Sequence, residues 1–175
     1  MSSVPDSTRR RDVIFVKPTI LTREETLVIG ITFTASVTEE LDKKLSATTT
    51  EALRARKSEI HHQVGEGEYL IQIYPDKDDF DAAIDPFTTI IGVEVSSPAD
   101  IPEGMVSHTI PTGTFAKVTH KGPETNLGET YGFLYGSWLS ESGYEYAGFD
   151  FEYWDERYKP EQEDNEIDIY VPLFK

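Results

Sequence analysis

The chain has 175 residues, 38% of them apolar, no cysteine and a net charge of −16 at pH 7. This length and apolar content are typical of one folded domain and exclude a wholly disordered chain. The lack of cysteine excludes disulfides and thiolate metal sites, and it fits a cytoplasmic location.

Acidic residues dominate the charge pattern, with 32 Asp and Glu against 16 Lys and Arg. Because phosphate-backbone binding depends on basic patches, we expect no direct nucleic-acid partner. No apolar run approaches the roughly 18 residues that a membrane span needs, so we expect no membrane partner. Residues 1–12 contain basic residues with no apolar segment after them, which predicts a flexible tail and not a secretory signal.

The first half of the chain predicts the element order β-α-β-β. Residues 24–37 are rich in β-branched side chains and predict a strand, and residues 38–60 predict a helix from leucines at near-helical spacing. Residues 68–75 and 87–96 predict two more strands. Residues 96–105 contain the Pro, Gly and polar side chains of a linker.

The second half predicts the same order again. Residues 106–120 predict a strand with a turn or bulge, residues 123–139 a helix, and residues 148–158 and 166–173 the last two strands. One face of that helix carries Leu127, Tyr131, Leu134, Tyr135 and Trp138.

Two halves of matching order indicate a duplication. We therefore predict an α+β fold of two β-α-β-β modules, at about residues 13–97 and 105–175, within a single domain over residues 13–175. Their antiparallel sheets would pair around a pseudo-two-fold axis, with the helices on one side and a ligand cleft on the other.

Three glycines recur every four residues in the second predicted helix, at Gly128, Gly132 and Gly136. Each glycine inside a helix costs on the order of 1 kcal/mol relative to alanine. We therefore expect them to serve close packing of the helix against the sheet; the alternative is that they line a ligand site.

Glu152 is an unusual residue in a segment whose aromatic neighbours are otherwise typical of a core strand. Side chains alternate across a strand, so Glu152 shares a face with Asp150 and Trp154. In the last strand we assign Ile167 to the helix-covered face, which leaves Tyr170 on the helix-free face, where we also place Glu152. Aromatic walls with one or two polar groups are typical of a small-molecule pocket, and a carboxylate among them suits a cationic or planar ligand. The alternative is a surface acid paired with a nearby Lys or Arg.

The remaining sequence motifs give no indication of a metal or a cofactor. The four histidines, His61, His62, His108 and His120, do not form a metal-ligand pattern, so we expect no metal. The sequence lacks a nucleophile elbow, a phosphate-binding loop and a dinucleotide fingerprint, so we expect no cofactor.

Five segments together resemble the GyrI-like (gyrase-inhibitor-like) effector-binding domain. They are "IPEGMV" (101–106), "IPTGTFAKVTHKGP" (110–123), "TYGFLYGSWLSESGYEY" (130–146), "FEYWDERY" (151–158) and "EIDIYVPL" (166–173). The resemblance is dense over residues 101–175 and looser in the first half. Relatives often have Tyr where this chain has Trp154, which changes the shape of the pocket.

The resemblance implies a pocket carboxylate that faces lipophilic, often cationic, ligands, and Glu152 is the residue that matches it. Glu94, Glu166 and Asp168 are alternatives for this role. The full set that we expect to bind ligand is Glu152, Trp154, Tyr170, Tyr74, Trp138 and Phe33.

The resemblance implies three functions. The first is a stand-alone binding protein for small lipophilic molecules, since 23 residues before the first strand are too few for a DNA-binding domain. The second is a hydrolase that opens cyclopropanoid genotoxins, with Glu152 as the general base and Tyr170, or else Tyr74, stabilising the charge that develops. The third is a protein-binding inhibitor of gyrase whose acidic face mimics DNA.

Overall fold

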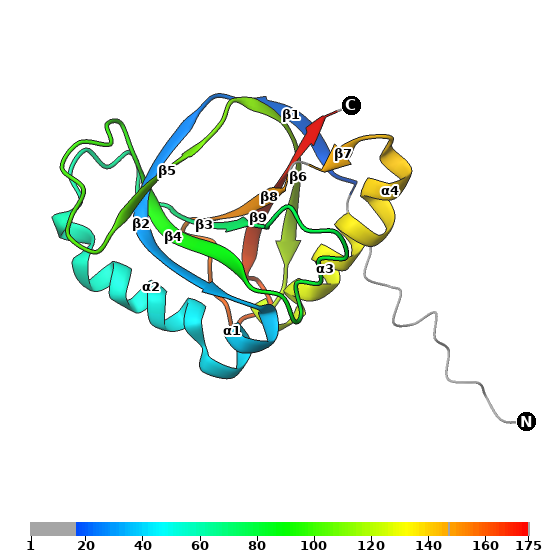
Figure 1. The fold of residues 1–175 in the computed structure, drawn as a ribbon, viewed down its shortest axis with the longest axis horizontal. Coiled ribbons are helices and arrows are strands. Elements are labelled where there is room, and N and C mark those ends of the chain that lie inside the picture. The colour runs from blue at the N-terminus through cyan, green and yellow to red at the C-terminus, as the bar shows by residue number, and fades with distance from the viewer. Residues whose placement is uncertain (1–16, 147, 175) are drawn as a thin grey trace, which may run out of the picture.

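A computed structural model describes residues 17–146 and 148–174, so the tail predicted at residues 1–12 lies outside the described residues. Within them, nine strands form one sheet in which every pairing is antiparallel. Figure 1 shows that the sheet is strongly curled and that the helices lie along one side of it. The α+β class and the antiparallel sheet are confirmed.

The first half of the chain gives four strands and two helices. They are β1 (Thr19–Arg23), β2 (Thr26–Ala35), α1 (Val37–Lys43), α2 (Leu45–Arg56), β3 (Glu68–Ile73) and β4 (Phe87–Val95). The single helix predicted over 38–60 is divided because Lys44 adopts a left-handed conformation, with φ of 53°. The side chain of Ser36 caps α1 by accepting a hydrogen bond from the backbone N–H of Glu39 at 3.2 Å.

The second half gives five strands and a helical segment of mixed type. They are β5 (Val106–Ile110), β6 (Gly113–Lys121), α3 (Leu127–Phe133), a π-helical segment (Leu134–Trp138), α4 (Leu139–Ser142), β7 (Glu145–Tyr146), β8 (Phe149–Trp154) and β9 (Glu166–Phe174). The predicted helix and strands are therefore present, and the predicted turn separates β5 from β6. No helix in the described part of the chain is both long and apolar enough to cross a membrane.

The strand order is symmetric about its centre. The sheet runs β1-β6-β9-β8-β3-β4-β2-β5, and β7 pairs with β9 outside this path. A pseudo-two-fold axis between β8 and β3 relates β6, β8 and β9 to β2, β3 and β4. The first strand of each half crosses over: β1 pairs with β6 of the second half, and β5 pairs with β2 of the first. The predicted duplication is thus present, with exchanged edge strands, while the domain boundaries stay a prediction.

The two faces of the sheet bury different clusters. The inner face of the curl is packed with apolar and aromatic side chains, among them Val28, Tyr69, Ile71, Phe115 and Phe151. The outer face packs against the helices and includes Leu53 of α2 and Leu134 of the π-helical segment.

One feature of the predicted fold needs correction, because Glu152 lies on the helix-covered face. In the β8–β9 pairing Glu152 is opposite Ile169, and in the β3–β8 pairing it is opposite Leu70. Residues opposite each other in adjacent strands share a face, and both partners belong to the cluster beneath the helices. The side of the sheet without helices is instead filled by the inner cluster.

The packing role expected for the helix glycines is also wrong. Gly128, Gly132 and Gly136 are exposed, and a Cβ added at any of them would meet no atom within 4 Å. Gly132 and Gly136 therefore weaken the helix without a compensating contact, whereas Gly128 lines the cavity described below.

This observation predicts opposite effects of alanine at two positions of the same helical segment. Gly132→Ala should raise the free energy of unfolding by roughly 0.5–1 kcal/mol, because alanine has the higher helix propensity and meets no clash. Gly143→Ala should lower it by about 1 kcal/mol, because Gly143 ends α4 with φ of 81°. Urea unfolding of both variants tests this, and a destabilised Gly132→Ala would contradict it.

Candidate ligand-binding site

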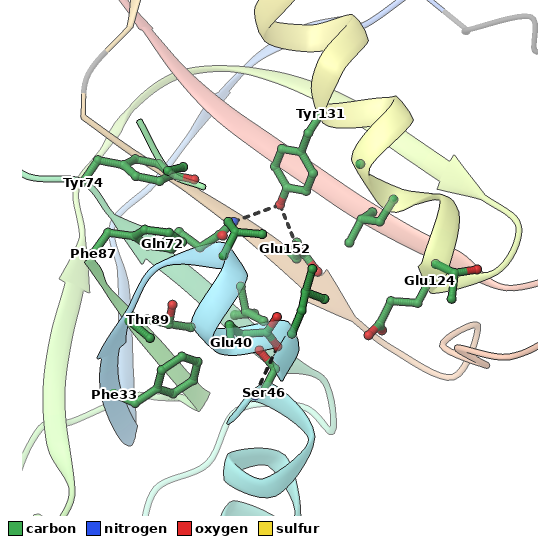
Figure 2. Close-up of a pocket in the computed structure, with 18 of the residues that line it drawn as sticks. Phe33, Glu40, Ser46, Gln72, Tyr74, Phe87, Thr89, Glu124, Tyr131 and Glu152 are labelled. Atoms are coloured by element: carbon green, nitrogen blue, oxygen red, sulfur yellow. Dashed lines mark hydrogen bonds between the residues drawn. The ribbon is translucent and has the colours of Figure 1, made fainter. Parts of the chain in front are cut away.

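A cavity of about 490 Å³ lies between the sheet, α1 with the start of α2, and α3 (Figure 2). Its volume falls in the range of pockets for drug-sized ligands. Its wall contains Phe33, Ala35, Val37, Glu40, Leu41, Ser46, Leu70, Gln72, Tyr74, Ala82, Phe87, Thr89, Glu124, Thr125, Leu127, Gly128, Tyr131, Tyr135, Glu152 and Trp154.

Glu152 forms part of the floor of this cavity. It is only 3% exposed, and it comes from the central strand β8. One carboxylate oxygen accepts a hydrogen bond from the Tyr131 hydroxyl at 2.6 Å, and the other accepts one from the indole N–H of Trp154 at 3.0 Å. Figure 2 shows the Tyr131 hydroxyl between Glu152 and Gln72, and the Gln72 amide donates to that hydroxyl at 3.1 Å.

A second carboxylate, Asp150, lies two residues earlier on the same face of β8. It is fully buried and does not line the cavity. The hydroxyl of Tyr135 donates to it at 2.6 Å, the amide of Gln72 at 2.8 Å and the hydroxyl of Tyr74 at 2.9 Å. Gln72 therefore links the hydrogen-bond networks of both carboxylates.

Both carboxylates hold their protons more tightly than usual. Burial raises the pKa of Glu152 to about 7, although the hydrogen bonds from Tyr131 and Trp154 act against this. Burial likewise raises the pKa of Asp150 to about 6, against the hydrogen bonds from its three donors. Burial also raises the pKa of the Tyr131 phenol well above its usual value. Near neutral pH the site can therefore change its charge while its phenols stay neutral.

No cation compensates these carboxylates within residues 17–146 and 148–174. Every ion pair of that part of the chain involves other acids. The described wall residues include two more acids, Glu40 and Glu124, and no Lys, Arg or His. An ionised carboxylate is costly to bury without a partner of opposite charge, so the cavity is suited to receive a cation.

Aromatic rings line the same cavity. Tyr131 and Tyr135 stack with an interplanar angle of 5°. Trp154 stacks on Tyr158 at a centroid distance of 4.4 Å, and the Tyr158 hydroxyl donates to Glu124. Ring faces attract cations and planar groups, so the walls complement the acidic floor.

Four of the six predicted ligand-binding residues line the cavity: Glu152, Trp154, Tyr74 and Phe33. Trp138 does not, since it packs against the outer cluster from the π-helical segment. Tyr170 lies on the opposite face of the sheet, opposite Phe151 in the β8–β9 pairing and stacked on its ring at 4.7 Å. The sheet thus separates Tyr170 from Glu152, and Tyr170 cannot act together with it.

The other candidate acids lie elsewhere. Glu94 accepts a hydrogen bond from Tyr69 of the inner cluster at 3.2 Å. Asp168 accepts one from Arg157 at 2.6 Å, and Glu166 lies 3.8 Å from the same guanidinium. Glu152 is therefore the only one of the four candidate acids that lines the cavity.

Sequence reasoning missed Tyr131, Tyr135, Gln72 and Asp150 as site residues. The signal was present for the two tyrosines, which share a helix face at i and i+4 spacing, and for Asp150, which has the same strand phase as Glu152. Gln72 has the same strand phase as Tyr74, one of the predicted ligand-binding residues. Among the described residues, no group of three or more His, Asp and Glu is placed to hold a metal ion.

The chain belongs to the GyrI-like family, because the GyrI-like small molecule binding domain matches residues 17–173. A curated relative, the transcriptional regulator BrlR of Pseudomonas aeruginosa, is 37% identical over 90 residues, which are 50% of this chain and 33% of that protein. The chain thus spans about a third of the length of this relative.

Solved structures share the fold at low sequence identity. The structure of SAV2435 bound to tetraphenylphosphonium has a TM-score of 0.67 and 11% identity, over 91% of this chain and 94% of that one. The C-terminal domain of EcmrR has a TM-score of 0.68 and 16% identity, over 93% of this chain and 99% of that one.

The buried acid predicts a pH-dependent stability difference between the wild type and Glu152→Gln. The folded-state pKa of Glu152 is raised above its ordinary value of 4.5. Its contribution to stability is therefore full below about pH 4.5 and is lost as the pH rises through about 7. Between pH 4.5 and 8, the wild type should lose on the order of 2–3 kcal/mol relative to the variant.

Urea unfolding at several pH values measures this difference. Glu161→Gln, which changes an exposed acid, serves as the control. Its free energy of unfolding should change with pH in the same way as that of the wild type. Parallel curves for Glu152→Gln and the wild type would contradict the prediction.

Proposed function

We propose that the chain binds small lipophilic molecules, cationic or planar, in the Glu152 cavity, for sensing, sequestration or resistance in the cytoplasm. The observation that carries this proposal is the buried Glu152 carboxylate, which has aromatic neighbours and neutral hydrogen-bond donors but no cationic partner within the described residues. A bound cation supplies the missing partner.

Proton release should accompany the binding of a cation. With a pKa of about 7, Glu152 is about half protonated at neutral pH. A nearby positive charge favours the ionised form and lowers the pKa. The ligand therefore displaces a proton, and its affinity should rise with pH between about 6 and 8.

The relatives support this ligand class without defining the biological role. SAV2435 binds tetraphenylphosphonium, a lipophilic cation, on a similar fold. BrlR is a transcriptional regulator, and EcmrR has been solved in a complex with DNA. We propose that this chain does not contact DNA itself, because its net charge is −16. In a regulatory role, ligand binding would be transmitted to another domain or protein.

A second candidate function is hydrolysis of cyclopropanoid genotoxins in the same cavity. The observation in its favour is that Glu152 combines a pKa of about 7 with a 2.6 Å hydrogen bond from Tyr131. A general base works best with a pKa near the operating pH. Of the two tyrosines expected to stabilise the developing charge, Tyr74 lines the cavity, whereas Tyr170 lies across the sheet. Turnover of a cyclopropane-bearing substrate by the wild type, lost in Glu152→Gln, would favour this function. The geometry of the cavity neither supports nor opposes the third predicted function, inhibition of gyrase.

The binding proposal is tested with two ligands of the same shape. We expect Glu152→Gln to weaken binding of 1-methyl-4-phenylpyridinium at pH 8 by roughly ten- to a hundredfold, which corresponds to about 1.5–3 kcal/mol for a lost charge contact. Its neutral isostere 4-methylbiphenyl should be affected far less. Calorimetric or fluorescence titration gives both affinities, and equal affinity of the two proteins for the cation would overturn the proposal.

A further inference from the structure

Asp150 is a buried carboxylate that the proposed binding of a single cation does not use. It is 0% exposed and accepts three hydrogen bonds, all from neutral groups: Tyr135, Gln72 and Tyr74. None of the ion pairs of residues 17–146 and 148–174 includes it. Its charge is thus solvated by the protein but is not neutralised.

The charge of Asp150 reaches the cavity through two phenols. Tyr74 and Tyr135 both line the cavity, and each points its hydroxyl hydrogen at the same oxygen of Asp150. A phenol that donates to a carboxylate is polarised, and its own oxygen keeps lone pairs that can accept. The wall at Tyr74 and Tyr135 is therefore a second negative region that does not require Asp150 to be exposed.

The two carboxylates behind these negative regions emerge from the sheet at a defined spacing. Asp150 and Glu152 are two residues apart on the same face of β8, and a strand rises about 3.3 Å per residue, so the two side chains emerge about 7 Å apart. Gln72 joins their networks, because its amide donates both to Asp150 and to the Tyr131 hydroxyl that binds Glu152. The spacing is therefore fixed by the central strand and by a shared hydrogen-bond donor.

We propose that Asp150, acting through Tyr74 and Tyr135, is a second specificity-determining residue and that the cavity selects rigid aromatic dications with charges about 7 Å apart. This proposal rests on the proposed cation-binding function. One positive group of the ligand lies at Glu152. The other lies against the phenol oxygens of Tyr74 and Tyr135.

Two carboxylates at the rim compete with Asp150 for this role. Glu124 accepts a hydrogen bond from Tyr158, and Glu40 accepts one from the backbone N–H of Ser46 at 3.3 Å. Both line the cavity, but they are half-buried, whereas Asp150 and Glu152 are buried. Solvent screens charges at a rim more strongly than charges at a buried floor, so we assign the second position to Asp150.

The test compares two cations of nearly identical shape on the full chain at pH 8. 1-Methyl-4-phenylpyridinium carries one charge, whereas 1,1′-dimethyl-4,4′-bipyridinium carries two charges at opposite ends of the same rigid biaryl frame. Both Asp150 and Glu152 are ionised at this pH, since their pKa values are about 6 and 7. The affinities are measured for the wild type, Asp150→Asn, Glu152→Gln and Glu124→Gln.

Asp150→Asn should weaken the dication about tenfold and the monocation by less than about threefold, because only the dication has a charge near that position. Glu152→Gln should weaken both. Glu124→Gln should not discriminate between the two ligands. An additional variant, Tyr74→Phe with Tyr135→Phe, keeps the Asp150 side chain but removes the phenol oxygens, and it should also weaken the dication selectively. This variant carries the test if Asp150→Asn does not fold.

Each result has a distinct meaning. Equal weakening of both ligands by Asp150→Asn would reduce Asp150 to a support for the tyrosines and overturn the inference. Selective weakening of the dication by Glu124→Gln alone would move the second position to the rim and also overturn it. Saturable binding of the monocation would leave the proposed function intact in both cases, whereas failure of the wild type to bind either cation would reject the proposed function itself.

Discussion

The curl of the sheet follows from two very short connections. Two residues, 24–25, join β1 to β2, and two residues, 111–112, join β5 to β6. In the strand order, each of these pairs is separated by six inter-strand steps, which would be ~29 Å apart in a flat sheet at about 4.8 Å per step. Three Cα–Cα steps reach at most about 11 Å. The two ends of the sheet must therefore approach each other, and the exchanged strands β1 and β5 hold the halves together.

The curl determines where a ligand can bind. It encloses the inner face, which is packed with aromatic and aliphatic side chains such as Phe115 and Phe151. On the outer face the helical segments of the two halves, α1–α2 and α3, contribute separate parts of the cavity wall (Figure 2). The floor of the resulting cavity is the junction of β3 and β8, the strands next to the pseudo-two-fold axis, and Glu152 lies on one of them.

The sequence predicted the type and the side-chain phase of most elements, but it did not predict how the elements pair with one another. The repeated order of elements and the strand phase of Glu152 follow from patterns of a few residues, and the structure has both. The face of the sheet on which Glu152 lies depends on which residue of β9 is opposite it. Glu152 is opposite Ile169, not Tyr170, and a shift of one residue exchanges the two faces. That register is set by long-range packing, as is the exchange of β1 and β5, and neither leaves a local signal. The same limit explains why the sequence predicted the helix face of Tyr131 but not its hydrogen bond to Glu152.

The choice of hydrogen-bond donors around the two carboxylates explains how a buried acid can remain useful for binding. A Lys or Arg beside Glu152 would stabilise its ionised form, but it would also cancel the field that attracts a cationic ligand. Tyr131, Trp154, Tyr74, Tyr135 and Gln72 satisfy the oxygens without adding charge. Their hydrogen bonds offset only part of the cost of burial, which is why the pKa values of both acids stay raised. In the proposed function, an entering cation would recover this residual cost, so part of the stability that the fold gives up at these positions would become binding energy for the ligand. Under the proposed function, neutral donors leave the charge of the acids available to a cation, and the central strand sets the spacing between the two acids.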